Sequence, residues 1–324
     1  MSHKIDYVPR PLGRNAPIYV AGHRGLVGSA VSRKLVAESF TDVRGLTSAE
    51  LDLRNRDAVF KYFAKHRPDT LIIAAAKVGG IYANNTFPVE FISHNLQIQL
   101  NLLDAALEQR IERVMFLGSS CIYPKMSPQP IKEEYLLTGA LEPTNEAYAI
   151  AKIAGIVQVQ SVRRQYGLPW ISAMPTNLYG PGDNFSADTS HVLPALIRRY
   201  DEAVHSGVQG VTNWGTGTPR REFLHVDDMA DAVLHLLENY DGDAQVNVGT
   251  GTDVTIKELA EIVARSVGYN GTMKWDSGKP DGTPRKLLDV STLKSTGWEP
   301  KIDLEQGVAR TVSWYRENMG AVRQ

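Results

Sequence analysis

Short apolar segments alternate with longer amphipathic segments through the first half of the chain. Helical spacing of apolar residues covers residues 26–38, 55–66, 88–110 and 145–166. Apolar runs of strand-like composition lie between them, at residues 17–21, 42–46, 69–76, 113–118 and 169–174. Regular alternation of this kind is typical of a parallel sheet with helices on both faces. The pattern therefore predicts an α/β fold built on a Rossmann-type doubly wound parallel sheet.

The pattern changes after residue 175. Residues 178–222 and 271–290 are rich in loop-forming residues. Further helical segments and one strand-like run are predicted at residues 192–205, 226–239, 255–267 and 245–248. We therefore expect part of the second half of the chain to rejoin the sheet and the rest to form a separate part that is richer in loops.

We expect two interleaved parts preceded by a tail. Residues 1–16 are predicted to form a poorly ordered N-terminal tail. Residues 17–177, joined by 222–249, are predicted to form the dinucleotide-binding domain. Residues 178–221 and 250–324 then make a smaller C-terminal substrate lobe. The region between the two parts is the expected binding site.

Composition and charge restrict the class of protein. Lys plus Arg total 35 against 36 Asp plus Glu, a net charge of −1, which gives no overall field for nucleic acid or an anionic membrane. The sequence has no run of about 18 apolar residues, so no transmembrane helix is predicted. The single cysteine, Cys121, cannot form an intrachain disulfide and fits a reducing compartment. We expect a cytoplasmic protein with no nucleic-acid partner, no membrane partner and, since no cluster has ligand spacing, no metal.

A glycine-rich segment follows the first predicted strand and opens the first predicted helix. It reads Gly22-His23-Arg24-Gly25-Leu26-Val27-Gly28. Glycines allow a tight turn there and let the helix N-terminus approach a pyrophosphate without a Cβ in the way. The strand–turn–helix setting favours dinucleotide binding over a plain turn.

The second predicted strand indicates which dinucleotide binds. NAD usually requires an acidic residue at its end, to hold the ribose 2′-hydroxyl. Here the end reads Arg44-Gly45-Leu46-Thr47-Ser48, without an acid. Arg24 offers a guanidinium to a 2′-phosphate instead, while Asp52 lies beyond the strand, where an adenine contact is more plausible. The sequence favours NADP.

Tyr148 and Lys152 are four residues apart on a predicted helix, so their side chains share one face. Free tyrosine titrates near pH ~10, and an adjacent ammonium is expected to stabilise its phenolate. Ser119 follows a predicted strand, at the end where α/β sheets place ligand contacts. A Tyr/Lys pair alone is usually a solvated helix face, but with the serine and the glycine loop it indicates a ketoreductase site.

These features resemble the extended short-chain dehydrogenase/reductase family, and within it the GDP-sugar 3,5-epimerase–4-reductases. The resemblance runs from about residue 18 to the C-terminus. Its motifs are residues 118–124 (GSSCIYP), 142–152 (EPTNEAYAIAK), 174–181 (MPTNLYGP), 221–228 (REFLHVDD) and 279–286 (KPDGTPRK). The resemblance implies an NADPH-dependent enzyme that converts GDP-4-keto-6-deoxy-D-mannose into GDP-L-fucose. It also implies a homodimer, in which helices 88–110 and 145–166 pair in a bundle.

The resemblance assigns roles by position. Ser119, Tyr148 and Lys152 are implied to be the reductase triad, and Cys121 and His191 the pair that moves protons during epimerisation. The substrate residues implied are Arg199, Trp214, Arg221 and Asp281. The cofactor residues implied are Gly22 to Gly28, Asp52, Leu53, Leu117, Gly118, Ser120, Lys152, Pro175, Thr176, Asn177, Leu178 and His191. Ser48 stands where relatives are expected to carry an arginine that assists Arg24.

The chemistry agrees with these residue types. A ketone at carbon 4 acidifies the protons on carbons 3 and 5, so both centres can be inverted through enolates. Inversion needs a base and an acid, and the reference pKa values of cysteine and histidine, about 8.5 and 6.5, bracket neutrality. Ser119 and Tyr148 would hydrogen-bond the enolate oxygen, and Tyr148 would then protonate it during reduction. Arginine and tryptophan suit a nucleotide diphosphate.

Without the resemblance, the residues also allow purely structural interpretations and two other functions. A lone cysteine is often a small buried apolar residue, and the choice of His191 among eight histidines rests on the resemblance. An NAD-dependent nucleotide-sugar 4-epimerase or 4,6-dehydratase shares the scaffold, but a dehydratase would want an acidic pair where Ser120 and Cys121 stand. A non-catalytic NADP sensor would not need Tyr148 and Lys152.

Overall fold

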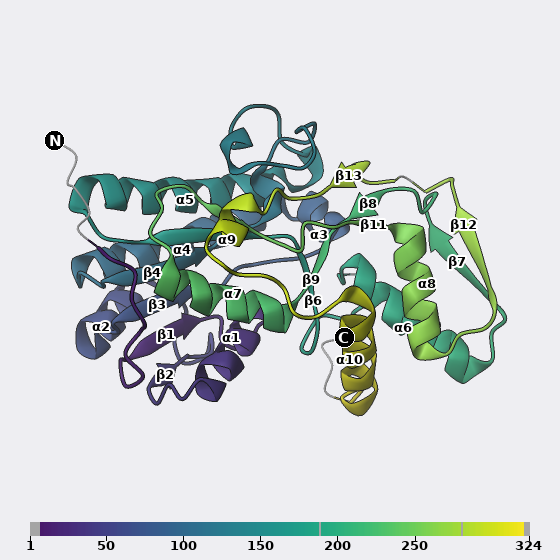
Figure 1. The fold of residues 1–324 in the computed structure, drawn as a ribbon, viewed down its shortest axis with the longest axis horizontal. Coiled ribbons are helices and arrows are strands. Elements are labelled where there is room, and N and C mark those ends of the chain that lie inside the picture. Colours follow the sequence, from purple (N-terminus) through teal and green to yellow (C-terminus); the bar gives the residue numbers. More distant parts are fainter. Residues whose placement is uncertain (1–6, 188, 280, 321–324) are drawn as a thin grey trace.

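The computed structural model describes residues 7–187, 189–279 and 281–320. Within these ranges, no helix is both long enough and apolar enough to cross a membrane. Figure 1 shows a layered α/β part joined to a smaller lobe. The chain crosses between the two more than once.

A six-stranded sheet forms the centre of the larger part. All of its neighbouring strands run parallel. In spatial order the strands are β10 (Val246–Val248), β5 (Ile171–Pro175), β4 (Arg113–Leu117), β3 (Thr70–Ile73), β1 (Ile18–Ala21) and β2 (Val43–Arg44). Strand order reverses at β1, which confirms the predicted doubly wound fold.

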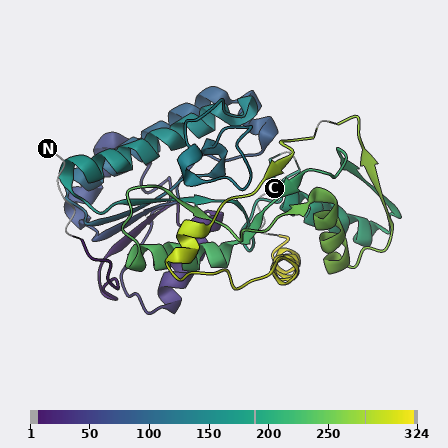
Figure 2. The same ribbon diagram turned by 45° about the horizontal axis from the view of Figure 1, so that its top comes forward.

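Helices cover both faces of this sheet (Figure 2). One face carries α2 (Arg56–His66), α4 (Pro88–Glu108) and α5 (Glu146–Tyr166), and the other carries α1 (Leu26–Ala37), α7 (Val226–Asn239) and α9 (Ser291–Ser295). Alternate strand residues enter the two layers: Tyr19 packs in the core with Phe63 of α2, while Ile18 and Val20 pack in the opposite core. Burial on both faces explains why these strands read as continuous apolar runs.

Three helices and several short strands build the smaller lobe, whose helices pack around a third buried cluster. The helices are α6 (Val192–Ser206), α8 (Ile256–Val267) and α10 (Leu304–Glu317). The paired strands are β7 (Gly210–Trp214) with β12 (Thr272–Asp276), and β6 (Asn177–Tyr179) with β9 (Phe223–His225). A three-stranded sheet has the order β11 (Val254–Thr255), β8 (Arg220–Arg221), β13 (Arg285–Lys286). The remaining short elements are α3 (Ile81–Thr86), η1 (Ser120–Ile122), η2 (Glu133–Tyr135) and η3 (Pro143–Asn145).

The structure differs from the expectations in two elements. The described residues between 271 and 290 are mostly loop, as their composition indicates, but they also contain the unpredicted strand β12, in which Met273 and Trp275 pack against the lobe core. This strand has a single partner, β7, so its sequence carries a weak strand signal. The second strand is shorter than the expected 42–46, because only Val43 and Arg44 pair with β1. The residue boundaries of the two parts remain a prediction.

The N-terminal segment packs onto the larger part. Residues 1–6 of the predicted tail lie outside the described residues, but residues 7–16 are described. Arg14 donates to Glu238 at 2.7 Å, and its guanidinium lies 4.2 Å from the ring centroid of Phe40. Leu12 packs against the core beneath α7. The expectation of a poorly ordered tail is therefore wrong for the described part.

Candidate active site

The glycine loop between β1 and α1 brings backbone atoms into very close contact. Gly22 has a φ of +82°, and a Cβ there would lie 2.7 Å from the Ala75 nitrogen. Gly25 caps α1 and donates its N–H to the Gly22 carbonyl at 2.8 Å. A Cβ on Gly28 would lie 2.1 Å from that same carbonyl oxygen. Positions 22 and 28 therefore require glycine, and the turn presents the N-terminus of a 12-residue helix to an anion.

The loop therefore fits the pyrophosphate of a dinucleotide. Leu26 and Val27, in the first turn of α1, pack against the core below it. Leu53, beyond β2, packs against the opposite core, and its carbonyl accepts a hydrogen bond from Asn101 at 2.9 Å. Asp52 is held by Arg54 through two side-chain hydrogen bonds of 2.8 and 3.0 Å.

The turn after β2 contains an acid that the sequence did not single out. Glu50 lies six residues beyond the end of β2, and its carboxylate accepts hydrogen bonds from the Thr47 N–H and hydroxyl, at 2.8 and 2.7 Å. These bonds lower the pKa of Glu50, and the positive side chains of Arg24 and His23 add to the effect. Ser48 and Arg24 are both exposed. An acidic residue in the turn that follows β2, and not only at the last residues of the strand, is the sequence signal that would have identified Glu50.

The predicted reductase residues come together at the carboxyl end of β4. Tyr148 lies in the first turn of α5 and hydrogen-bonds Ser119. Lys152, one turn further, is 3% exposed and donates to the Leu117 carbonyl at 2.8 Å. Gly155 allows this approach, because a Cβ there would lie 2.4 Å from the Phe116 ring. The close packing of α5 on β4 places the serine, tyrosine and lysine side by side.

The electrostatics of this group correct one expectation. Burial raises the pKa of Tyr148 above its ordinary value, and Cys121 adds to the increase, while the Ser119 hydrogen bond opposes it. Lys152 donates to backbone rather than to the phenol, and its ammonium lies 5.9 Å from the Tyr148 ring centroid. Burial lowers the pKa of Lys152 to about 8. Desolvation, not the neighbouring ammonium, dominates Tyr148, which keeps the phenol protonated as a proton donor should be.

Cys121 lies in the same turn as Ser119. It belongs to η1, and its N–H donates to the Ser119 hydroxyl oxygen at 3.3 Å. Lys286 of β13 donates to the Cys121 sulfur at 3.5 Å, and Arg221 of β8 interacts with Cys121 electrostatically. Ser120 is buried. The cysteine therefore stands beside the reductase group, with two cations of the lobe near it.

His191 belongs to the lobe, where it is the N-cap of α6. The preceding residue, Ser190, lies against Gly80 in the loop after β3. A Cβ on Gly80 would be 3.4 Å from the Ser190 carbonyl oxygen. His191 is exposed to solvent, yet surrounding protein atoms shield its imidazole enough to lower its pKa. A neutral imidazole at neutral pH can accept or return a proton.

The segment expected on the nicotinamide side links the sheet to the lobe. Pro175 ends β5 and Leu178 lies in β6. Thr176 and Asn177 both donate side-chain hydrogen bonds to the carbonyl of Glu222, at 3.2 and 2.8 Å. Gly118, on the neighbouring strand end, donates its N–H to Ala173 at 2.9 Å. A Cβ on Gly118 would lie 2.3 Å from the Met174 sulfur, so this edge is tightly packed.

The residues expected to bind the GDP-sugar lie on several elements of the lobe. Arg199 of α6 donates to the Thr212 carbonyl and the Asn213 side chain, both at 3.3 Å. Trp214 ends β7 and is 68% exposed, with the Lys279 ammonium 5.5 Å from its ring centroid. An indole this exposed has a free face on which a base can stack.

Arg221 belongs to β8, and Asp281 lies between β12 and β13. The Asp281 carboxylate accepts hydrogen bonds from the Thr216 N–H and hydroxyl, at 3.0 and 2.6 Å. Arg221 donates to the Arg220 carbonyl at 2.7 Å, and burial lowers its pKa. A Cβ on Gly282 would lie 2.9 Å from the Arg221 guanidinium, so this glycine leaves room for the arginine.

Two residues with clear structural links to the site were not found from the sequence. Lys286 contacts Cys121, as described above. Glu222 is fully buried, and its carboxylate accepts N–H groups of Gly251 and Leu288 at 2.7 and 3.0 Å. Both lie within motifs of the resemblance, but Lys286 is in a strand of two residues and Glu222 lies between two short strands, so neither has a periodicity that would assign it a face. No group of three or more His, Cys, Asp or Glu residues that could hold a metal occurs in the described ranges.

Known proteins share this architecture and much of the sequence. Residues 18–249 match the sequence model of the NAD dependent epimerase/dehydratase family. The chain is 58% identical over 307 residues to the probable GDP-L-fucose synthase 1 of Oryza sativa subsp. japonica, covering 94% of each chain. It is 51% identical over 315 residues to the GDP-L-fucose synthase of Escherichia coli (strain K12), covering 94% of this chain and 98% of that one. The solved structure of a GDP-L-fucose synthetase from Naegleria fowleri bound to NADP superposes with a TM-score of 0.90, at 29% identity, over 99% of both chains.

Proposed function

The chain belongs to the NAD dependent epimerase/dehydratase family, and from that premise we propose that it converts GDP-4-keto-6-deoxy-D-mannose into GDP-L-fucose. The reaction comprises epimerisation at carbons 3 and 5 and NADPH-dependent reduction at carbon 4. The observation that carries this proposal is the presence of Cys121 in the same turn as Ser119, beside the Tyr148–Lys152 helix. A simple ketoreductase needs the serine, tyrosine and lysine but has no use for a thiol among them.

The epimerase steps use the acidity of carbons next to the ketone. Cys121 and His191 are the groups that remove and return protons there, since a thiol and an imidazole can each act as acid and base. Each proton removal sends the electron pair of the C–H bond into an enolate. Hydrogen bonds from Ser119 and Tyr148 stabilise the enolate oxygen as charge develops on it.

The reductase step uses the same oxygen. The chemistry that NADPH supplies when bound is a hydride for carbon 4. The protonated Tyr148 phenol gives its proton to the carbon-4 oxygen, while Lys152, held by the Leu117 carbonyl, lies one helical turn away. Gly22, Gly25 and Gly28 fit the pyrophosphate, since a side chain at two of these positions would meet backbone. Arg24 would hold the 2′-phosphate.

We place the GDP moiety on the lobe. Trp214 offers an exposed ring for the base, while Arg199 and Arg221 offer guanidinium groups for the diphosphate. Asp281 is held by Thr216 and would accept from donors of the nucleotide or sugar. The lobe would thereby hold the sugar ring against the carboxyl end of β4.

We further propose a cytoplasmic homodimer. A working thiol requires a reducing compartment. Helices α4 and α5 pack against each other and expose Leu100, Ile150 and Val157, which are 42%, 40% and 39% exposed. Pairing of these helices with their copies in a second chain would cover that apolar surface. Val157→Glu is expected to convert the dimer to a monomer in light scattering.

The decisive experiment separates the two half-reactions. Wild-type protein in heavy water, given the keto-sugar and NADP⁺ without NADPH, should incorporate deuterium at carbons 3 and 5, as seen by proton NMR. With NADPH it should yield GDP-L-fucose. Cys121→Ser should slow the exchange by about two to four orders of magnitude, because a serine hydroxyl does not ionise near neutral pH. Reduction without exchange in the wild type would contradict the proposal and indicate an ordinary 4-ketoreductase.

A further inference from the structure

Two neighbouring strands of the lobe place four basic residues in a defined register. β8 and β13 run parallel, with Arg285 opposite Arg220 and Lys286 opposite Arg221. Successive residues of a strand point to opposite faces. Arg220 and Arg285 therefore share one face of this small sheet, while Arg221 and Lys286 share the other.

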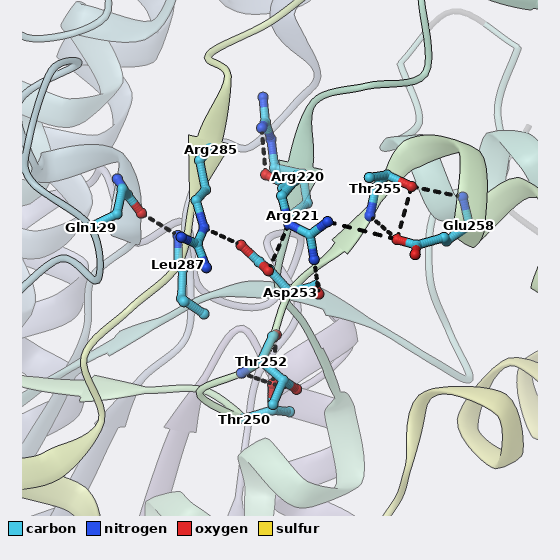
Figure 3. Close-up of polar contacts among 10 residues, drawn as sticks. All are labelled: Gln129, Arg220, Arg221, Thr250, Thr252, Asp253, Thr255, Glu258, Arg285 and Leu287. Atoms are coloured by element: carbon cyan, nitrogen blue, oxygen red, sulfur yellow. Dashed lines mark hydrogen bonds and ion pairs between the residues drawn. The ribbon is translucent and has the colours of Figure 1, made fainter.

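The first face is neutralised by a carboxylate. Asp253, whose side chain is 4% exposed, accepts hydrogen bonds from Arg220 at 2.9 Å and from Arg285 at 2.5 Å. Figure 3 shows both guanidinium groups converging on Asp253, while Arg221 points away from it. The pair on this face is thus a structural clamp between β8, β13 and the segment before β11.

The second face carries two cations opposite each other, an arrangement that costs stability unless an anion lies nearby. Lys286 directs its ammonium to the Cys121 sulfur at 3.5 Å. Arg221 donates to the Arg220 carbonyl and interacts electrostatically with Cys121 and Asp281. Of the two cations, Lys286 is the one with a direct hydrogen bond to the sulfur.

We propose that Lys286 is a positioning residue for the epimerase half-reaction, holding the Cys121 sulfur and stabilising the thiolate that removes the proton. This inference rests on the proposed function of Cys121. The thiolate takes the proton from the sugar carbon and becomes the thiol, while the electrons of the broken C–H bond enter the enolate. Lys286 keeps its proton throughout and compensates the negative charge of the sulfur before transfer.

The surroundings of Cys121 support this role. The groups that face the sulfur or its turn are Ser119, Tyr148, Arg221 and Lys286. Arg221 and Lys286 are the two basic side chains among them, and Lys286 is the one that contacts the sulfur directly.

The strand that carries Lys286 is fixed directly after it. The Leu287 N–H donates to the Gln129 side chain at 2.9 Å, and the Leu288 N–H donates to the buried Glu222 carboxylate at 3.0 Å. These two bonds attach the residues that follow β13 to two different segments, one containing Gln129 and the other Glu222. Lys286 therefore approaches the sulfur from a fixed backbone, on a side chain that is half-buried.

The test measures the ionisation of the thiol directly. The chain contains one cysteine, so the rate of alkylation by iodoacetamide against pH reports Cys121 alone. Lys286→Met should raise the pH midpoint of alkylation by about one unit and slow the reaction about tenfold at neutral pH. Lys286→Gln should do the same, and Lys286→Arg should restore most of the wild-type rate. Arg285→Met is the matched control, since it removes a positive charge from the same strand on the opposite face and should leave the profile unchanged.

A second readout keeps this inference separate from the proposed function. Deuterium exchange by Lys286→Met should be slow at neutral pH and recover toward the wild-type rate as pH rises, with NADPH affinity unchanged. A wild-type alkylation profile in both Lys286→Met and Lys286→Gln would overturn the role of Lys286, even if Cys121→Ser abolishes exchange. Full exchange by Cys121→Ser would instead overturn the proposed base and this role with it, even if the alkylation profile shifts. An equal shift in Arg285→Met would show a general charge effect and would also overturn the inference.

Discussion

Two alanine substitutions in the glycine loop test whether close backbone contact shapes the dinucleotide site. In Gly28→Ala, the new Cβ would lie 2.1 Å from the Gly22 carbonyl oxygen. In Gly25→Ala, the new Cβ would lie 3.3 Å from the same oxygen. The two variants make the same chemical change in one loop and differ mainly in the distance to one atom.

The distances predict different costs in the free energy of unfolding. Ordinary contact begins at 3.4 Å, so Gly28→Ala forces α1 and the Gly22 turn apart by about 1 Å. Overpacking costs about 1–3 kcal/mol, and we expect a cost in the upper part of this range because the Gly22 carbonyl is backbone and cannot rotate away. The higher helix propensity of alanine offsets about 1 kcal/mol of this cost, which leaves a net loss of about 1–2 kcal/mol in the free energy of unfolding. Gly25 has φ −75° and ψ 170°, which alanine adopts freely, so its net cost is near zero.

Thermal unfolding and NADPH titration read out the two effects. Gly28→Ala should lower Tm by about 1.5–3 °C and also weaken NADPH binding, because the helix N-terminus has moved. Gly25→Ala should keep its Tm within about 1 °C of the wild type but still weaken NADPH binding, because its Cβ stands where the pyrophosphate approaches. Equal Tm values for Gly28→Ala and the wild type would refute the contact argument. Undiminished NADPH affinity in both variants would show that the pyrophosphate lies elsewhere.

Three further predictions concern the cofactor and the reductase residues. Arg24→Ala should reduce the preference for NADPH over NADH by about tenfold to a hundredfold, the effect of losing a charged contact of about 1.5–3 kcal/mol; equal kcat/KM for the two cofactors in the wild type would contradict this. Tyr148→Phe should abolish NADPH oxidation but leave NADPH affinity almost unchanged, as absorbance and fluorescence assays can show, and retained turnover would exclude Tyr148 as the proton donor. Burial lowers the pKa of Lys152 to about 8 in the folded chain, from its ordinary value of 10.5. The unfolded chain therefore holds more protons between these two pH values, and the stability contributed by this residue rises with pH. The free energy of unfolding of the wild type relative to Lys152→Met should therefore increase from about pH 8 to 10, by at most about 1.4 kcal/mol per unit, in urea titrations at several pH values; a flat or falling difference would contradict the burial of a charged Lys152.

The sheet could be predicted because its strands are buried on both faces. Runs such as residues 69–76 and 113–118 are mostly apolar and contain β3 and β4. The lobe gives a weaker signal, because β8, β11 and β13 contain two residues each. A strand of that length has no periodicity, and its position depends on partners far away in the sequence. Physical patterning therefore predicts the layered part of the fold but not the small sheet of the lobe.

The candidate site divides in the same way. Ser119, Tyr148 and Lys152 could be identified because they follow a strand or share a helix face, and the structure places them together. Lys286 could not be identified, since its contact with Cys121 joins residues 165 positions apart. The expectation that Lys152 controls the ionisation of Tyr148 also failed, because sequence reveals the charge of a neighbour but not the desolvation that outweighs it.

The buried Glu222 connects the lobe to the large sheet, and this connection matters for the proposed reaction. Residues of the reductase group come from the ends of β4 and α5, whereas the cations near Cys121 come from β8 and β13 of the lobe. The buried Glu222 joins these parts: its carbonyl holds Thr176 and Asn177, and its carboxylate holds the backbone of Leu288. Because one residue fixes both the segment after β5 and the segment after β13, the lobe cations cannot shift relative to the sheet without breaking buried hydrogen bonds. A site that both inverts and reduces one sugar ring needs this constraint, since the thiol and the phenol must reach neighbouring atoms of the same substrate.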